Sequence, residues 1–511
     1  MHKKILSLGA KIFIGGILGA GMLLGSCRKD NKGQNPVTPE PVAEDSLKYL
    51  MYQIMQVTYA DGGRNNAAGL PTYYWYSLVK QRNPLDAQYP NADTLLSRMK
   101  ADAPLDRYSF IDRDGALTNK LMNGVSEQAF EAASADYGFD YGIVAGAPGK
   151  VRLFVLYADK NSPSGQAGVQ RGWEITSVNG NTSFDDTRAS KLQIFNDIFN
   201  SKSVNLVFRK PDNSTTPPQT FSSSGTYAIN PVLYDTVYNV NGKNVGYFVM
   251  YTFSSVVNSS GQTTATKTAL DQVFNKFASK GISSLIVDFR YNGGGAVSTA
   301  EYLDNAIAPA SASGKVMYKY IYNDKLMQNL EATKLQSTVN FSSSTGSMAL
   351  DKIFFITSGS TASASELTLN NLKPYFLNNL QLVGQKTYGK PVGFIDFEIA
   401  MYVNSVKKHL ADLYAINFET QNANGGGGYY TGIDVNVTAT DYVNVPWGDP
   451  SDDNLKKIFS YLTTGSYSRA APEGRTAVST ESNLRELIPG AKPMKEFNGM
   501  VEFRKERIKN L

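Results

Sequence analysis

The chain has little of the chemistry that builds metal sites and disulfides. Among its 511 residues there is one cysteine, Cys27, and there are two histidines, His2 and His409. A structural zinc site needs about four cysteine or histidine ligands, so such a site is excluded, and an internal disulfide cannot form. A Cys–His catalytic pair has only Cys27 as its nucleophile, and a Ser-His-Asp triad depends on His409. We therefore expect no metal and no cofactor.

The chain also has no large excess of charge of one sign, with 50 basic and 45 acidic residues. The formal net charge is +5, which argues against a dedicated nucleic-acid-binding protein. Hydrophobic residues make up 42% of the chain and charged residues 19%, as in an ordinary globular protein rather than a disordered or coiled-coil one. At about 150 residues per domain, the length indicates roughly three domains.

The N-terminus has the layout of an export signal. A lysine-containing start precedes an apolar, glycine-rich run from Ile12 to Leu24, which is too short for a comfortable transmembrane helix. The run ends in LGSC, which resembles a bacterial lipobox. We expect residues 1–26 to be a removed signal peptide, Cys27 to be lipidated, and the protein to lie in the cell envelope, facing the periplasm or exposed at the surface. The alternative is an ordinary signal peptide with an incidental cysteine.

Residues 27–44 are polar and proline-rich, which predicts a flexible tether. From Asp45 the pattern becomes helical. Apolar side chains recur there at helical spacing, at Leu47, Leu50, Met51, Ile54 and Met55. An aromatic stretch from Tyr73 to Val79 and a segment from Thr94 to Met99 predict further helices. Together, residues 45–135 indicate a small helical N-terminal domain.

From Tyr141 the period changes to that of short strands. Val151 to Tyr157 predicts one strand. The next stretch, SPSGQAGVQRGWEITSVNG, contains a short helix, a glycine turn and a strand ending in Asn-Gly. It resembles part of a PDZ domain, whose extent here would be residues 138–225. The resemblance implies a second helix at 188–199 and a closing strand from Val204 to Phe208.

PDZ domains bind peptide C-termini by adding a strand to an exposed sheet edge. In that fold the carboxylate-binding loop precedes the second strand. The resemblance therefore places this loop at Tyr141, Gly142, Ile143 and Val144.

Residues 230–465 alternate strand and helix patterns, which predicts an α/β core. Leu285 to Phe289 is a continuous apolar run, typical of a strand buried on both faces, and a helix is expected from about Ser363 to Leu372. The glycine run at 425–428 lacks the Lys-Ser/Thr of a phosphate-binding loop and is interpreted as a surface loop. The C-terminal tail, residues 466–511, is left unassigned.

Three segments carry candidate chemistry: DFRYNGGG at 288–295, SGSTASASE at 358–366 and GQKTYGK at 384–390. A serine at a helix N-terminus meets unpaired N–H groups and the positive end of the helix dipole, which stabilise negative charge. A glycine run lets backbone N–H groups approach a ligand closely. Together these features suit the oxyanion of an acyl-transfer reaction. The base can be a lysine whose pKa is lowered by burial, and Lys390 stands on a tight backbone where its amine can point inward.

The order of these motifs, downstream of a PDZ-like stretch, closely resembles that of the C-terminal processing peptidases, or tail-specific proteases, of peptidase family S41. The resemblance covers about residues 140–450. It implies Ser363 as the nucleophile and Lys390 as the general base. It also implies an oxyanion hole formed by the N–H of Ala364 and by the glycine run, at Gly294 or one position away. The scarcity of histidine agrees with a Ser–Lys dyad.

One feature departs from the family pattern. Family members often carry an aspartate about three turns into the helix after the serine, where this chain has Pro374, so support for the dyad would come from elsewhere, with Asn370 or Asn371 as candidates. The helical N-terminal region and the segment DRYSF at 106–110 resemble the lipoprotein branch of the family, and Asp106 is interpreted as structural.

The sequence thus predicts a multidomain α/β protein with a small N-terminal helical domain, a PDZ domain of strands with two helices, and a ClpP/crotonase-like peptidase core. Its expected function is that of a lipid-anchored serine endopeptidase. The expected partners are proteins or peptides with unstructured C-termini, and the membrane through the lipid anchor; an activator or an oligomer stays open. The alternatives are a catalytically impaired member that binds peptides as a PDZ scaffold, which Pro374 favours, and a non-peptidic hydrolase using the same dyad.

Overall fold

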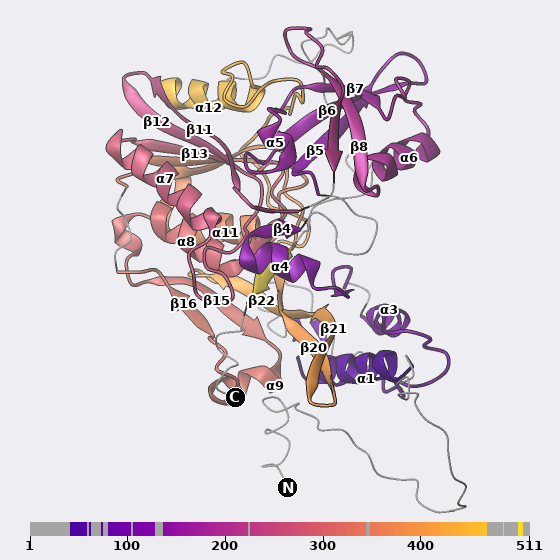
Figure 1. The fold of residues 1–511 in the computed structure, drawn as a ribbon. Helices are drawn as coiled ribbons and strands as arrows, with labels where there is room; N and C mark the ends of the chain where they lie inside the picture. Colours follow the sequence, from indigo (N-terminus) through magenta and orange to yellow (C-terminus); the bar gives the residue numbers. More distant parts are fainter. Residues whose placement is uncertain are drawn as a thin grey trace, which may run out of the picture.

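The structure is a computed structural model that describes residues 41–58, 61–62, 73–74, 80–103, 106–127, 136–222, 225–343, 348–467, 484 and 499–503. The signal peptide expected at 1–26, Cys27 and most of the expected tether lie outside the described residues. In Figure 1 a small sheet with helix α6 (Arg188–Phe199) lies at the upper right. The helices α1 (Pro41–Thr58) and α3 (Ala92–Asp102) lie at the lower right, beside the hairpin of β20 (Phe397–Val403) and β21 (Val406–Tyr414).

The N-terminal region combines helices with short strands. Its elements are α1 (Pro41–Thr58), β1 (Asp61–Gly62), β2 (Tyr73–Tyr74), α3 (Ala92–Asp102), β3 (Phe110–Asp112), α4 (Ala116–Asn123) and β4 (Val125–Glu127). Asn91 caps α3, since its Oδ1 accepts a hydrogen bond from the Thr94 N–H at 2.8 Å. The prediction of a helix from Tyr73 to Val79 is wrong for its first two residues, because Tyr73 and Tyr74 form β2, which pairs with β1.

The middle of the chain folds into a five-stranded antiparallel sheet with two helices. Its elements are β5 (Phe139–Ala145), β6 (Val151–Ala158), α5 (Pro163–Gln166), β7 (Glu174–Val178), α6 (Arg188–Phe199), β8 (Ser203–Arg209) and β9 (Gln219–Ser222). The strand order is β5-β6-β7-β8-β9. The predicted helix at 188–199 and the strand within 203–209 are confirmed.

The largest part of the chain alternates strands and helices, as its sequence pattern predicts. Its elements are β10 (Thr226–Ala228), β11 (Val232–Val240), β12 (Lys243–Met250), α7 (Ala265–Ser279), β13 (Ser284–Asp288), β14 (Gly294–Ala296), α8 (Val297–Ile307), β15 (Val316–Tyr322), α9 (Asp324–Met327), α10 (Leu330–Thr333), β16 (Thr338–Asn340), β17 (Lys352–Thr357), α11 (Ala364–Phe376), β18 (Leu380–Gly384), β19 (Val392–Ile395), β20 (Phe397–Val403), β21 (Val406–Tyr414), β22 (Ile416–Asn422), β23 (Val437–Thr438), α12 (Asp453–Thr464) and β24 (Gly499–Glu502).

Two six-stranded sheets form the core. The first has the order β11-β12-β13-β17-β18-β23 and is parallel from β12 onward. Alternate residues of β13 enter different apolar clusters: Leu285 and Val287 face α7 and α11, whereas Ile286 faces α12. The run is therefore buried on both faces, as predicted. The second sheet has the order β14-β24-β19-β22-β15-β16.

The N-terminal region shares its core with the strands of the second half. Strand β3 pairs with β21 in a three-stranded sheet with β20, and β4 pairs with β10. The apolar cluster of Leu47, Met51 and Leu95 also contains Phe394 and Ile416. The helices expected between 45 and 135 are therefore joined by strands that pair with strands of the α/β core.

A buried ionic network joins the five-stranded sheet to this core. Arg171, in the turn before β7, donates to Asp441 Oδ1 at 2.6 Å, and Arg290 donates to the same oxygen at 2.7 Å. Burial opposes ionisation of Asp441, but the charges of Arg171 and Arg290 outweigh it and lower the pKa of that carboxyl to about 2. The Trp447 ring lies 4.2 Å from the Arg171 guanidinium. Charge pairing and packing thus hold the two units together.

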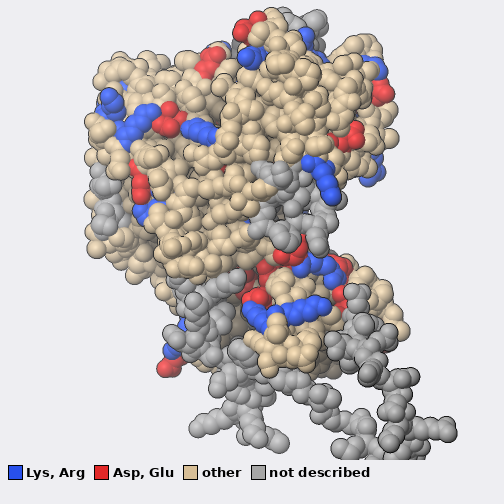
Figure 2. Space-filling view, in the orientation of Figure 1, with Lys and Arg blue, Asp and Glu red and all other residues tan. Residues whose placement is uncertain are grey.

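The outer surface carries mixed charge. On the face in Figure 2, Lys and Arg side chains lie beside Asp and Glu rather than in a patch of one sign. Of the helices that the structure describes, none has the length and apolar character needed to cross a membrane.

Replacing Arg171 tests the network. We expect Arg171→Met to lower the free energy of unfolding by about 3–5 kcal/mol, because buried acceptors lose their cation. The measurement is urea denaturation followed by tryptophan fluorescence. Arg188→Met, at the exposed start of α6, is the matched control and should change stability by less than about 0.5 kcal/mol. Equal effects of the two variants would contradict the prediction.

A buried acid lies between α8 and α11. Asp304 is 0% exposed, and its Oδ2 accepts a hydrogen bond from Asn371 Nδ2 at 2.8 Å. Its Oδ1 has no hydrogen-bond partner among the described residues. Burial raises the pKa of Asp304 to about 7, so the folded protein holds a proton that the unfolded chain releases.

This raised pKa makes stability depend on pH. The contribution is fully present below pH ~4, the usual aspartate pKa, and is lost as pH rises through the folded value near 7. We expect Asp304→Asn to gain stability relative to the parent between pH ~4 and 7, by up to about 1.4 kcal/mol per pH unit, and the difference to level off above that. Urea denaturation of both proteins across this range measures it; a constant difference would show that Asp304 ionises normally.

Candidate active site

Ser363 stands at the turn between a buried strand and a buried helix. It follows β17 and the loop 358–362 and immediately precedes α11. Its backbone has φ +56° and ψ −105°, a conformation that L-residues rarely adopt. Such strain persists only when the surroundings enforce it, and it clusters at functional sites.

The loop before Ser363 is tied to the segment that follows β13. Thr361 Oγ1 donates to the Phe289 carbonyl at 2.8 Å, and the Ser358 hydroxyl donates to the Arg290 carbonyl. The Asn292 carbonyl accepts from the Ala362 N–H at 3.1 Å and from the Ser365 hydroxyl at 3.0 Å. The motif that ends in three glycines thus holds the loop that carries Ser363.

The glycine run approaches the start of α11 closely. A Cβ atom added at Gly294 would lie 3.0 Å from the Ala364 nitrogen and 2.3 Å from the Gly499 oxygen, so no side chain fits there. Ala364 is the first residue of α11, where backbone N–H groups have no intrahelical acceptor. The Gly294 N–H donates to Asn292 Oδ1 at 2.9 Å. The two amides predicted for the oxyanion hole are therefore brought together, and that of Gly294 is already engaged.

Lys390 points inward, as expected. It is 1% exposed, and its Nζ lies 4.1 Å from the Phe394 ring centroid and 4.7 Å from that of Tyr108. Burial lowers the pKa of Lys390 well below its usual value, although the charges of Asp106 and Glu366 oppose the shift. An amine in this setting loses its proton more readily than the amine of a solvated lysine.

Glu366 joins the two halves of the site. Its Oε2 accepts the backbone N–H of Ser363 and that of Lys390, each at 2.8 Å. Its Oε1 accepts the Gly389 N–H at 2.7 Å and the Thr387 hydroxyl at 2.5 Å. Burial raises the pKa of Glu366, and these four donors oppose the shift. One carboxylate therefore fixes the backbone of Ser363 relative to that of Lys390.

The reactive side chains themselves are not hydrogen-bonded to each other. Ser363 is 0% exposed, and its Oγ has no hydrogen-bond partner among the described residues. The two asparagines predicted as support point elsewhere: Asn371 Nδ2 donates to Asp304, and Asn370 Nδ2 donates to the Gly426 carbonyl at 2.9 Å. Pro374 lies inside α11. Glu366 takes the supporting place instead.

Asp106 and Tyr108 bring the N-terminal region to the lysine. Asp106 Oδ1 accepts the N–H groups of Tyr108 and Ser109 at 2.9 and 2.8 Å, which is the structural role predicted for it. The Tyr108 hydroxyl donates to the Gly389 carbonyl at 3.1 Å. The same segment therefore covers Lys390 and binds its neighbouring backbone.

The residues predicted for the PDZ loop lie in a strand. Residues 141–144 fall inside β5, the terminal strand of the five-stranded sheet, rather than in a loop before it. The Tyr141 ring stacks on Phe199 of α6, with 5.8 Å between centroids. The structure corrects the loop assignment: residues 141–144 are all buried and pair with β6 as part of the strand.

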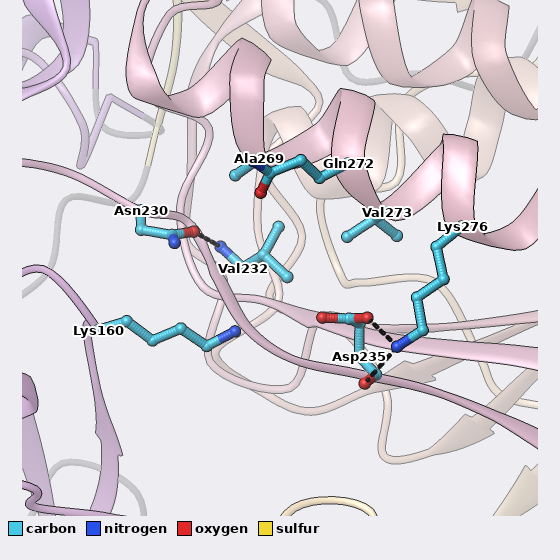
Figure 3. Close-up of a pocket in the computed structure, with 8 residues that line it drawn as sticks. All are labelled: Lys160, Asn230, Val232, Asp235, Ala269, Gln272, Val273 and Lys276. Atoms are coloured by element: carbon cyan, nitrogen blue, oxygen red, sulfur yellow. Dashed lines mark hydrogen bonds and ion pairs between the residues drawn. The ribbon is translucent and has the colours of Figure 1, made fainter.

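A cavity of about 240 Å³ lies away from these residues, between α7, β11 and the loop that follows β6. Figure 3 shows Lys160 directed toward it, and Lys276 bonded to Asp235 on its far side. None of its lining residues is a predicted site residue. Within the described ranges, no group of three or more His, Cys, Asp or Glu side chains is placed to hold a metal ion.

Glu366 ends the predicted motif at 358–366, but no role is predicted for it from the sequence. A signal was present, since a serine followed three residues later by glutamate is the spacing of a capping box. That spacing predicts the bond between the Glu366 carboxylate and the Ser363 N–H. The bonds to residues 387–390 could not be predicted, because they join segments whose approach depends on the whole fold.

Three solved structures are similar to this chain. A crystal structure assigned to the S41 proteases, from Bacteroides fragilis NCTC 9343, is 20% identical, with a TM-score of 0.59 over 81% of this chain and 96% of that one. The photosystem II D1 C-terminal processing protease is 17% identical, with a TM-score of 0.43 over 82% of this chain and 98% of that one. Mature CPAF, complexed with lactacystin, is 12% identical, with a TM-score of 0.40 over 83% of this chain and 98% of that one.

No curated protein matches the chain. The model of the family described as Peptidase family S41 matches residues 244–410, which include the glycine run, Ser363, Glu366 and Lys390. Residues 244–410 of the chain thus match peptidase family S41, and the fold is shared with a solved structure assigned to that family.

Proposed function

We propose that this protein is a serine endopeptidase of the C-terminal processing type that uses Ser363 as nucleophile and Lys390 as general base. One observation carries the proposal. A buried, strained serine at a helix N-terminus and a buried lysine of lowered pKa hold their backbones to one oxygen of Glu366. Nucleophile, base and anion-stabilising amides are the parts that acyl transfer needs.

In the first step, Ser363 Oγ attacks the carbonyl carbon of the scissile bond and its proton passes to the neutral amine of Lys390. The N–H of Ala364 and the glycine run stabilise the oxyanion. The C–N bond then breaks, and the protonated lysine gives its proton to the leaving amine. Water, deprotonated by Lys390, attacks the acyl-enzyme, and the serine hydroxyl is restored as the acid product leaves.

The remaining parts of the proposal concern delivery of substrate. The five-stranded sheet would act as a PDZ domain that captures unstructured protein C-termini along the edge of β5, since β5 ends its sheet. Cys27 would carry the lipid that anchors the protein in the cell envelope. Nucleic acid has no place in the proposal.

A second candidate is a peptide-binding protein without catalysis. It is favoured by the fully buried Ser363, whose Oγ lacks a hydrogen bond to Lys390. Hydrogen bonds between catalytic groups are often long without substrate and shorten when it binds, so the missing Ser363–Lys390 hydrogen bond does not decide between the two functions. Acylation of Ser363 does.

The decisive test follows cleavage of an unfolded protein with an apolar C-terminus by mass spectrometry. We expect the full chain to cleave it, and Ser363→Ala to lower the rate by about 10⁴-fold or more. Lys390→Met should lower it comparably, and the parent rate should fall as pH drops through the lowered pKa of Lys390, because the protonated amine is no base.

Ser360→Ala, an exposed serine in the same loop, is the matched control and should keep activity. A parent that neither cleaves protein nor reacts with a fluorophosphonate at Ser363 would support the peptide-binding alternative. Hydrolysis of small esters without any peptide cleavage would support a non-peptidic hydrolase.

Glu366 is expected to act by positioning. Glu366→Gln keeps one acceptor oxygen and turns an amide NH₂ group toward two of the four donors. The backbones of Ser363 and Lys390 are then no longer fixed relative to each other by one carboxylate. We expect kcat to fall about 10–100-fold with little change in KM. Glu398→Gln, where the glutamate on β20 pairs with Lys407 at the surface, is the control. A rise in KM alone would place Glu366 in substrate binding instead.

A further inference from the structure

Residues 499–502 of the C-terminal tail lie beside the glycine run of the candidate active site. Strand β24, residues 499–502, runs parallel to β14 on one side and to β19 on the other. The Gly499 N–H donates to the Gly293 carbonyl at 3.0 Å. The tail left unassigned from the sequence thus supplies the strand between the glycine run and the strand that follows Lys390.

This strand is packed as core. Met500 and Val501 are both 0% exposed, and they belong to different apolar clusters, Met500 to that of α8 and α11 and Val501 to that of α1 and α3. Glu502 is 8% exposed, and its Oε2 accepts the Tyr320 hydroxyl at 2.9 Å. A segment bound by backbone, apolar and polar contacts at once is a fixed part of the fold.

The glycine run needs such a partner. Two of the three residues of β14 are glycines, with φ of +108° at Gly294 and +140° at Gly295. Glycine loses much conformational freedom when it is ordered and has no side chain to pack. Besides β24, β14 is held by Phe253, whose N–H donates to the Gly294 carbonyl at 2.9 Å and whose carbonyl accepts the Ala296 N–H at 2.6 Å. Without β24, one edge of the run is open.

We propose that residues 499–502 form a positioning strand of the active site, such that the chain cut before Gly499 is folded but inactive. This inference rests on the proposed peptidase function. The strand holds the backbone of the glycine run beside the Ala364 nitrogen, where the oxyanion is expected, and it links that run to the strand of the base. Loss or displacement of the C-terminal segment is then an off-switch for the enzyme.

The test compares two truncated chains that differ by residues 499–503, which contain this strand. One chain ends at Asn498 and the other at Phe503, so that only the second retains β24. We expect the shorter chain to melt cooperatively, but to react with a fluorophosphonate at Ser363 and to cleave an unfolded protein at least ~100-fold more slowly, the loss typical of a missing oxyanion donor. The longer chain should match the full chain.

Adding the strand back separates positioning from damage. A synthetic peptide with the sequence of residues 496–506, EFNGMVEFRKE, should restore the rate of the shorter chain, whereas the same peptide with aspartate in place of Met500 and Val501 should not. Unchanged or increased activity of the shorter chain would overturn the proposal, the increase by showing that the strand blocks the site. Loss of cooperative melting would also overturn it, because the strand would then serve the whole fold.

Hydrogen exchange separates this inference from the proposed function. Amides of residues 293–296 should exchange faster in the chain that ends at Asn498 than in the one that ends at Phe503. If the full chain proves inactive, the proposed function fails, and the exchange rates still decide whether β24 orders the glycine run.

Discussion

The buried carboxylate of Glu366 is the constraint on which the site depends. A charge removed from water is tolerated only where donors replace its hydration, and Glu366 has four, from Ser363, Thr387, Gly389 and Lys390. Because two of these are the backbones of the predicted nucleophile and base, neither segment can shift without leaving a buried donor or acceptor unmatched. The free-energy cost of a buried carboxylate without donors therefore keeps the backbone of Ser363 and that of Lys390 in place relative to each other.

The same burial sets the charge state of the base. Desolvation lowers the pKa of Lys390 and outweighs the opposing fields of Asp106 and Glu366, while it raises the pKa of Glu366 itself. The shift of the lysine favours its neutral form, which is the state a lysine base requires, whereas the four donors to Glu366 oppose the shift of the glutamate and favour its carboxylate. Tyr108, from the N-terminal region, excludes water on one side of the lysine, so this distant segment belongs to the same electrostatic design.

Local patterns predicted the parts of this molecule that local chemistry decides. The strand at 284–288 follows from its continuous apolar run, and the start of α11 follows from the serines that precede it. The helix at 188–199 is implied by the resemblance to a PDZ domain. The pairing of residues 499–502 with the glycine run could not be predicted, because the sequence of a four-residue strand does not determine which distant strands it pairs with. For the same reason the strands β3 and β4 were missed: their pairing with β21 and β10 supplies order that their sequences do not encode.

A contiguous set of contacts links the five-stranded sheet to the nucleophile. Arg171 and Arg290 share Asp441 Oδ1, and the Arg290 carbonyl accepts the hydroxyl of Ser358, at the start of the loop that carries Ser363. Each step is buried or nearly so, where charge-assisted hydrogen bonds are strong and an unpaired partner is costly. The docking of that sheet and the strained backbone of Ser363 are thus stabilised by one network, and a movement of the sheet that releases Asp441 alters the support of the loop that carries Ser363.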